Sequence, residues 1–146
     1  MTRSVLCAID LSNGDADSRV LRQAAKLADL DGAQLDVVTV LPDFGDAWVS
    51  TFFEPHHHEK AEAETRKQLE AMCVATLGED RNASIRHVIA TGAAYREILK
   101  TAKAADTDLI VIGAHTPDLK DYLLGPNAAR VIRHSECSVY VVRGEN

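Results

Sequence analysis

The sequence contains little of what marks disulfide-rich, membrane-spanning and secreted proteins. It has three cysteines among 146 residues, and they form no close pair. An odd number of separated cysteines argues against a disulfide framework and against CxxC metal or redox chemistry. Apolar runs such as Val5–Ile9 and Leu109–Gly113 are far shorter than the ~20 residues of a membrane-spanning helix, and the first is too short for a secretory signal. We therefore expect a cytoplasmic protein.

The sequence also lacks an excess of positive charge. Its 16 lysines and arginines are outnumbered by 22 aspartates and glutamates, so the formal net charge is −6 with neutral histidines. A dedicated binder of nucleic acid or of an anionic membrane needs a basic surface, so the charge argues against both partners. The composition, 46% hydrophobic and 26% charged, is typical of a globular protein. The length predicts one domain over residues 1–146.

Several common catalytic motifs are absent. The chain has no Gly-x4-Gly-Lys-Ser/Thr, no Gly-x-Gly-x2-Gly and no Gly-x-Ser-x-Gly segment. It therefore carries no P-loop, dinucleotide fingerprint or hydrolase nucleophile elbow. His56–His58 are followed by Glu59, but the final histidine of a His-Glu-x-x-His zinc motif is missing. We interpret this segment as part of a mobile, charged loop at about residues 43–58, and not as a metal site.

Hydrophobic periodicity predicts strands that alternate with helices. Short apolar runs indicate strands buried on both faces, and apolar residues at helical spacing indicate the helices between them. The pattern predicts an α/β fold of the Rossmann-like type: an open, doubly wound, five-stranded parallel sheet with helices on both faces. The expected strands are Val5–Ile9, Leu35–Leu41, Ser84–Ala90, Leu109–Ala114 and Ser138–Arg143, and the expected helices are Ala16–Asp29, Glu59–Leu77, Ala93–Ala105 and Ala128–His134.

Two connections allow more than one interpretation. Asp10–Asp15 has turn composition, and Asp15 or Asp17 is a plausible cap for the first helix. Pro42–His58 shows no periodicity and is long for a structureless connection, so it is either a functional flap or locally helical. Its three aromatic residues would form a lid over a ligand, contact another subunit or enter the core; they are Trp48, Phe52 and Phe53.

Polar residues and glycines follow the first and fourth strands. In a doubly wound sheet, ligands bind at the carboxyl ends of the strands where the strand order reverses. If these two strands flank that point, Asp10, Ser12, Gly113 and His115 face one crevice. Asp10 and Ser12 also suit turn chemistry. Gly113 allows close approach of the backbone to a ligand, and Gly125 precedes a helix whose first N–H groups favour an anion.

Two segments resemble the universal stress protein family in its single-domain, nucleotide-binding branch. They are Ala8–Ser12 and Gly113–Arg143, the latter with the run Leu-Leu-Gly-Pro-Asn-Ala-Ala-Arg-Val-Ile-Arg-His. The family's ATP-binding members carry Gly-x2-Gly-x9-Gly followed by Ser or Thr. Gly113 and Gly125 match the first and third glycines. Thr116 stands where the second is expected, or one residue is deleted there.

The resemblance implies where ATP and Mg²⁺ would bind. Asp10 would approach the ribose or a nucleotide-bound Mg²⁺, and Arg130 would reach a terminal phosphate or remain a solvent-exposed helix charge. Pro126 replaces the usual hydroxyl residue and removes an N–H donor, for which Asn127 offers an amide. The implied nucleotide-binding residues are Ala8, Ile9, Asp10, Ser12, Val40, Ile112, Gly113, His115, Gly125, Pro126, Asn127, Ala128 and Arg130.

The resemblance further implies a nucleotide-dependent regulator of the stress response. It implies a homodimer that pairs through the C-terminal strand at residues 138–143, and an unidentified protein partner. We expect nucleotide binding without turnover, because no nucleophile or paired carboxylate is identifiable beside His115. Two alternatives remain: a nucleotide-free dimeric interaction module of the same fold, and a slow ATPase or phosphoryl- or adenylyl-transfer enzyme that uses His115.

Overall fold

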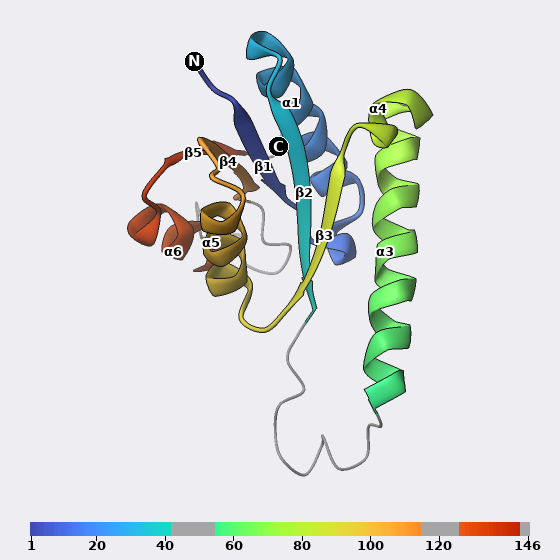
Figure 1. Ribbon diagram of the computed structural model, residues 1–146. Helices are drawn as coiled ribbons and strands as arrows, with labels where there is room; N and C mark the ends of the chain where they lie inside the picture. The colour runs from blue at the N-terminus through green and yellow to red at the C-terminus, as the bar shows by residue number, and fades with distance from the viewer. Residues whose placement is uncertain (42–54, 115–125, 144–146) are drawn as a thin grey trace.

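Five parallel strands form one sheet in the computed structural model, which describes residues 1–41, 55–114 and 126–143 and the side chains of all of these except 55–58. The strand order is β3-β2-β1-β4-β5, as Figure 1 shows. The predicted α/β fold and the five predicted strands are confirmed. The strand bounds are Ser4–Ala8 for β1, Gln34–Leu41 for β2, Arg86–Thr91 for β3, Leu109–Gly113 for β4 and Ser138–Val142 for β5.

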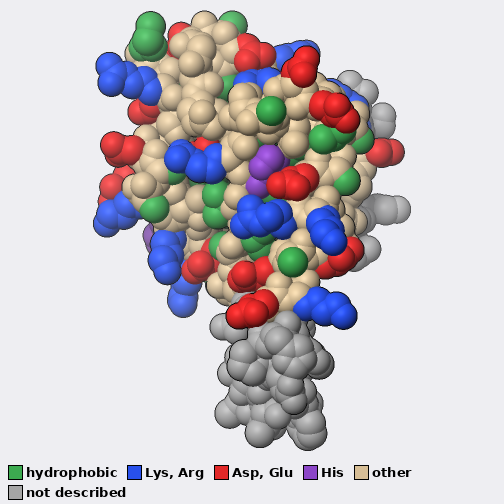
Figure 2. Space-filling model, turned by 45° about the vertical axis from the view of Figure 1, so that its right-hand side comes forward, with side chains coloured by type: hydrophobic (Ala, Val, Ile, Leu, Met, Phe, Trp, Pro, Cys, Tyr) green, Lys and Arg blue, Asp and Glu red, His purple; other side chains and the backbone are tan. Residues whose placement is uncertain are grey.

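Helices cover both faces of this sheet (Figure 1). The helices α1 and α3 pack on one face, and α5 and α6 pack on the other. The helix bounds are Leu11–Asn13 for the 3-10 turn η1, Asp15–Asp31 for α1, Pro55–Leu77 for α3, Glu79–Ala83 for α4, Ala94–Ala104 for α5 and Pro126–His134 for α6. Figure 2 shows acidic and basic side chains intermixed on the side where α3 lies.

The central strands have apolar side chains on both faces because each face packs against helices. Along β1, Val5 and Cys7 point into the core beneath α1 and α3, whereas Leu6 and Ala8 point into the core beneath α5 and α6. The side chains of β1 are all buried. This alternation, which follows from the two-residue repeat of a strand, explains why the strand appears in the sequence as a continuous apolar run.

The structure differs from the sequence analysis at three places. The N-cap of α1 is Gly14, at φ 56°, so the predicted caps Asp15 and Asp17 are wrong and both lie in the first turn, where carboxylates complement the helix dipole. The short elements η1 and α4 were not predicted, because periodicity does not reveal elements of so few residues. The helix α3 begins at Pro55, before the expected Glu59, so residues 55–58 belong to a helix and not to the expected loop at about 43–58; proline suits the first position of a helix. Trp48, Phe52 and Phe53 lie outside the described residues.

An ion pair with one buried partner joins β2 to β3. Asp36 has no exposed surface, and its carboxylate accepts hydrogen bonds from Arg86 Nε at 3.0 Å and Arg86 NH2 at 2.8 Å. The two residues are direct partners in the parallel register. The Arg86 side chain is 59% exposed, so the guanidinium links a buried charge to the solvent. The hydrogen bond with Asp36 raises the pKa of Arg86.

The sheet order determines where a ligand site is expected. The chain runs from β1 to β2 and β3 at one edge of the sheet, and then crosses to β4 and β5 on the other side of β1. The strand order therefore reverses between β1 and β4, which are neighbours in the sheet. The carboxyl ends of these strands therefore form the predicted crevice. Within the described part of the chain, no helix has the length and apolar character needed to cross a membrane.

Candidate functional site

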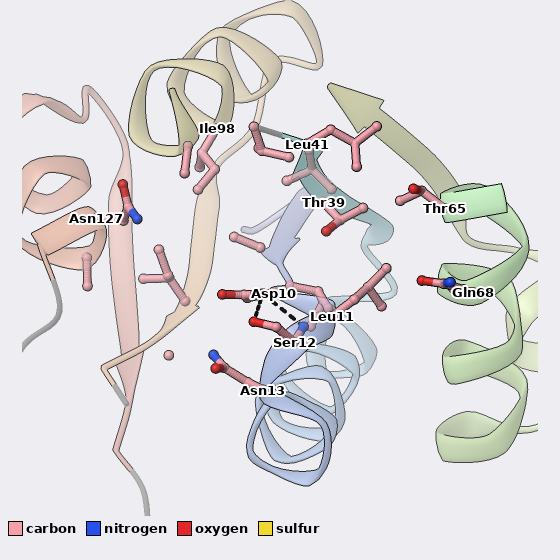
Figure 3. Close-up of a pocket in the computed structure, with 18 of the residues that line it drawn as sticks. Asp10, Leu11, Ser12, Asn13, Thr39, Leu41, Thr65, Gln68, Ile98 and Asn127 are labelled. Atoms are coloured by element: carbon pink, nitrogen blue, oxygen red, sulfur yellow. Dashed lines mark hydrogen bonds between the residues drawn. The ribbon is translucent and has the colours of Figure 1, made fainter. Parts of the chain in front are cut away.

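A cavity of about 600 Å³ opens at the carboxyl ends of β1, β2 and β4, where Figure 3 shows its side chains. Its volume lies within the range of about 300–1,000 Å³ that is typical of small-molecule sites. The described residues that line it are Ala8, Ile9, Asp10, Leu11, Ser12, Asn13, Val38, Thr39, Val40, Leu41, Thr65, Gln68, Ala94, Ile98, Ile112, Gly113, Pro126, Asn127 and Ala128.

The part of the cavity next to α5 is apolar. Val38 and Val40 of β2, Ile98 of α5 and Ile112 of β4 belong to the core beneath α5 and α6, and all four reach the cavity. Ala8 at the end of β1 leaves room between them. A slot of small and branched side chains suits a flat apolar ring.

The turn after β1 holds Asp10 at the rim. Asp10 Oδ1 accepts a hydrogen bond from Ser12 N at 3.0 Å and another from Ser12 Oγ at 2.6 Å, and Asp10 is the N-cap of η1. Figure 3 shows both bonds. Asp10 therefore stabilises this turn, which is one of the two roles that the sequence analysis gave it. The Asp10 side chain is exposed, so it remains accessible to a ligand.

Asp17 anchors the same turn from α1. Its side chain is 4% exposed, and its carboxylate accepts hydrogen bonds from Asp10 N and from Asn13 Nδ2. Burial, followed by the charge of Asp17, raises the pKa of the Cys7 thiol, so Cys7 stays protonated and unreactive. Asp17 thus positions the rim of the cavity, a role that its place in the sequence did not reveal.

Gly113 lines the cavity, and its lack of a side chain also serves helix packing. A Cβ at this position would lie 3.0 Å from Val20 Cγ2 and 3.7 Å from Asp17 Oδ1, both on α1. The prediction assigned this glycine to close approach of a ligand. The contact with α1 is a second reason for a glycine here, because a methyl group would press on a buried valine.

The N-terminus of α6 forms the opposite wall. Pro126, Asn127 and Ala128 line the cavity, and the first N–H groups of a helix are free to bind an anion. Pro126 contributes no N–H, whereas the Asn127 side chain is exposed and carries an amide. The predicted site residues Gly125 and His115 lie outside the described residues.

Arg130 is the one described site residue of the prediction that does not line the cavity. It is exposed on α6, and its guanidinium carbon lies 5.1 Å from the centroid of the Tyr95 ring, a distance at which a cation–π contact stabilises the pair. Arg96 also lies over this ring, at 5.7 Å, and donates a hydrogen bond to the Tyr95 hydroxyl at 3.0 Å.

The electrostatics of the cavity are simple. Asp10 is the only charged side chain among the described lining residues, and none of them is a lysine, arginine or histidine. No group of three or more His, Cys, Asp or Glu side chains within the described ranges is placed to hold a metal ion by itself. A divalent cation would therefore need further ligands from the bound molecule.

Sequence reasoning missed the lining residues contributed by η1, the interior of β2 and the helices α3 and α5. Alternation along β2 was the available signal, since Val38 faces the same way as Val40. Nothing in the sequence indicates that Thr65 and Gln68 of α3 or Ala94 and Ile98 of α5 reach the strand ends. The missed residues are Leu11, Asn13, Val38, Thr39, Leu41, Thr65, Gln68, Ala94 and Ile98.

Comparisons with known proteins agree with this architecture. The model of the universal stress protein family matches residues 1–143. Universal stress protein G of Salmonella typhimurium is 30% identical over 149 residues, which cover 98% of this chain and 100% of the relative.

Solved structures share the fold. The structure of the hypothetical protein MJ0577 matches with a TM-score of 0.81 at 23% identity, over 100% of this chain and 99% of that protein. The universal stress protein of Archaeoglobus fulgidus, whose structure is a complex with dAMP, matches with a TM-score of 0.64 at 23% identity, over 95% and 96% of the two chains.

Proposed function

This chain belongs to the universal stress protein family, and on that premise we propose that it binds an adenine nucleotide, ATP in particular, in the cavity at the carboxyl ends of β1, β2 and β4. The observation that carries the proposal is the cavity itself: an apolar slot beside an accessible carboxylate, with a helix N-terminus opposite. The match to a dAMP-bound universal stress protein supports an adenine nucleotide as the ligand.

The lining residues suit the three parts of a nucleotide. Val38, Val40 and Ile98 offer apolar surface for the base. The free oxygen of Asp10 is an acceptor for ribose hydroxyls, and Asn127 with the N-terminus of α6 offers donors to phosphate. These residues bind and orient the ligand. The roles of Ile9, Ser12, Ile112, Pro126 and Ala128 are to shape the same walls.

We also propose that ATP binds with Mg²⁺. Asp10 is negative, and the described lining contains no cationic side chain to offset a triphosphate. Mg²⁺ typically binds through one or two carboxylates together with substrate phosphates. Asp10 is the residue that would hold it, and the ion would supply the positive charge that the described lining lacks.

Binding without turnover is the proposed activity. Asp10 is engaged by Ser12 within the turn, and none of the histidines or lysines in the described part of the chain lines the cavity. The proposed biological role is a cytoplasmic, homodimeric regulator of the stress response, which acts on a protein partner according to its bound nucleotide.

The thermal midpoint, measured with and without Mg-ATP, AMP and GTP, tests the proposal. A ligand at about 100 times its dissociation constant stabilises a protein by about 2.7 kcal/mol, which raises the midpoint of a domain of this size by several degrees. We expect such a rise with ATP in the wild type. Ala94→Leu should reduce it, because the larger side chain at the start of α5 takes up part of the space in the cavity.

Ala104→Leu is the matched control. It makes the same change at the exposed far end of the same helix, so the ATP-induced rise should persist. A wild type that no nucleotide stabilises would contradict the proposal. That result would favour a nucleotide-free interaction module, for which the loss of an N–H donor at Pro126 is the supporting observation.

A further inference from the structure

A second cavity, of about 330 Å³, lies where the chain leaves α5 and α6, two helices that pack side by side (Figure 1). The loops that follow these helices lead into the amino ends of β4 and β5, whereas the first cavity lies at the carboxyl ends of the strands. Its volume is at the lower end of the range typical of small-molecule sites. The described residues that line it are Leu99, Ala102, Lys103, Asp106, Thr107, His134, Ser135, Glu136 and Cys137.

Thr107 brings an unsatisfied hydroxyl to this cavity. The residue is 9% exposed, and its Oγ1 is buried with no hydrogen-bond partner within the described part of the chain. Buried polar groups are normally hydrogen-bonded, and one that is left unpaired is costly. A ligand that pairs with this hydroxyl therefore gains affinity, so the unpaired group points to a molecule that binds here.

Cys137 is the cysteine whose thiol a solute can reach. Cys7 and Cys73 have no exposed surface, and burial raises the pKa of both thiols, that of Cys73 to about 11. Cys137 is half-buried and lines the cavity. Ser135 fixes its position, because Ser135 Oγ donates to Cys137 O at 2.8 Å and accepts from Cys137 N at 3.1 Å. Since the thiolate is the reactive form of cysteine, we expect thiol chemistry at Cys137 and not at the other two.

The groups around this thiol carry charges of both signs. Lys103 offers an ammonium group, whereas Asp106 and Glu136 offer carboxylates, and all three residues are exposed. A ligand of one sign would be repelled by part of this lining, whereas a ligand with both ammonium and carboxylate groups can pair with each part. Small peptide thiols carry both kinds of group close to a single sulfur.

We propose that this cavity accepts a small zwitterionic peptide thiol, which becomes linked to Cys137 as a mixed disulfide. The thiol arrives in its oxidised form, and the Cys137 thiolate attacks one sulfur of that small disulfide. A bond forms between the two sulfurs as the S–S bond of the small disulfide breaks, and the released thiolate takes up the proton that Cys137 lost. Cys137 is thereby oxidised, and half of the small disulfide is reduced. The site does not depend on nucleotide binding, because the two cavities share no described lining residue.

The exchange equilibrium in a buffer of reduced and oxidised glutathione, measured by intact-mass spectrometry, tests the site. Hydroxyethyl disulfide with its own thiol, which is uncharged, is the comparison, and each constant is divided by that of a synthetic peptide of residues 134–140. We expect one adduct, which peptide mapping places on Cys137, and a preference for glutathione. Thr107→Val should lower the glutathione constant about three- to tenfold, the effect of one hydrogen bond, and leave the other constant unchanged.

Lys103→Gln should lower the glutathione constant in the same way, because it removes the partner of a carboxylate. Lys100→Gln, on the same helix but outside the cavity lining, is the matched control and should change neither constant. Cys137→Ser should form no adduct. An adduct on another cysteine, a disulfide-linked dimer in its place, or a glutathione constant no larger than that of the peptide would overturn the proposal. The thermal midpoints of the unmodified variants show that each has folded.

Discussion

At the scale of single residues, the contribution of His87 on β3 to stability depends on pH. Its ring Nε2 lies 2.7 Å from Asn82 Oδ1 of α4, so the neutral ring donates there, and Arg66 NH1 donates to the His87 carbonyl at 3.1 Å. Burial lowers the pKa of His87 below its ordinary 6.5; Glu70 opposes this shift and Arg66 adds to it.

The lowered pKa predicts a loss of stability in mild acid. The unfolded chain takes up a proton at a higher pH than the folded chain does, so the contribution of neutral His87 is complete above the ordinary pKa of 6.5. It is lost as the pH falls from that value toward the lower folded pKa. The free energy of unfolding, measured with urea between about pH 7.5 and about pH 5.5, should therefore fall more in the wild type than in His87→Gln.

His134→Gln on the exposed end of α6 is the control and should keep the wild-type pH dependence. Parallel curves for the wild type and His87→Gln would show that His87 does not carry the effect.

At the scale of elements, the ion pair between Asp36 and Arg86 links β2 to β3. Arg86→Leu leaves a fully buried carboxylate without its cation. Breaking a fully buried pair costs about 3–5 kcal/mol; because the Arg86 side chain is 59% exposed, we expect a loss nearer about 2 kcal/mol. Chemical denaturation measures it.

The double variant Asp36→Leu/Arg86→Leu separates the lost pair from a general defect in the strands. Replacing both charges by apolar groups removes the unpaired carboxylate, so the double variant should be more stable than Arg86→Leu alone. A double variant that is the less stable of the two would contradict this account.

At the scale of the whole molecule, β5 is the edge of the sheet that we propose for dimerisation. Tyr140 on this strand is 41% exposed. Val142 O accepts a hydrogen bond from Ala114 N, so the backbone N–H and C=O of Val142 face β4. Backbone groups alternate in direction along a strand, so those of Val141 face outward. An outward-facing strand edge is a template for pairing with another chain.

Val141→Pro should convert a dimer into a monomer. Proline removes the outward N–H and leaves the bonds to β4 in place. Light scattering after size-exclusion chromatography measures the mass, and the thermal midpoint shows that the variant folds. A monomeric wild type, or a dimeric variant with unchanged mass, would contradict pairing through β5.

Local pattern in the sequence was sufficient for the strands, the class of sheet and the motif-bearing end of the cavity. The run Val5–Ile9 indicates a strand because its own side chains are apolar on both faces, and Asp10 is found because it directly follows that strand. Such signals lie within a few neighbouring residues. The family resemblance extended them to Asn127 and Pro126, which do line the cavity.

Tertiary structure alone decided which distant side chains meet at that end of the sheet. Periodicity shows that one face of a helix is buried, but it does not show what that face contacts. Thr65 and Gln68 therefore became site candidates only when α3 was seen beside the cavity. Gly113 also lies against Val20 of α1, and Arg130 lies over Tyr95 and does not line the cavity. Each of these contacts joins residues far apart in the chain, so the packing of the helices decides it.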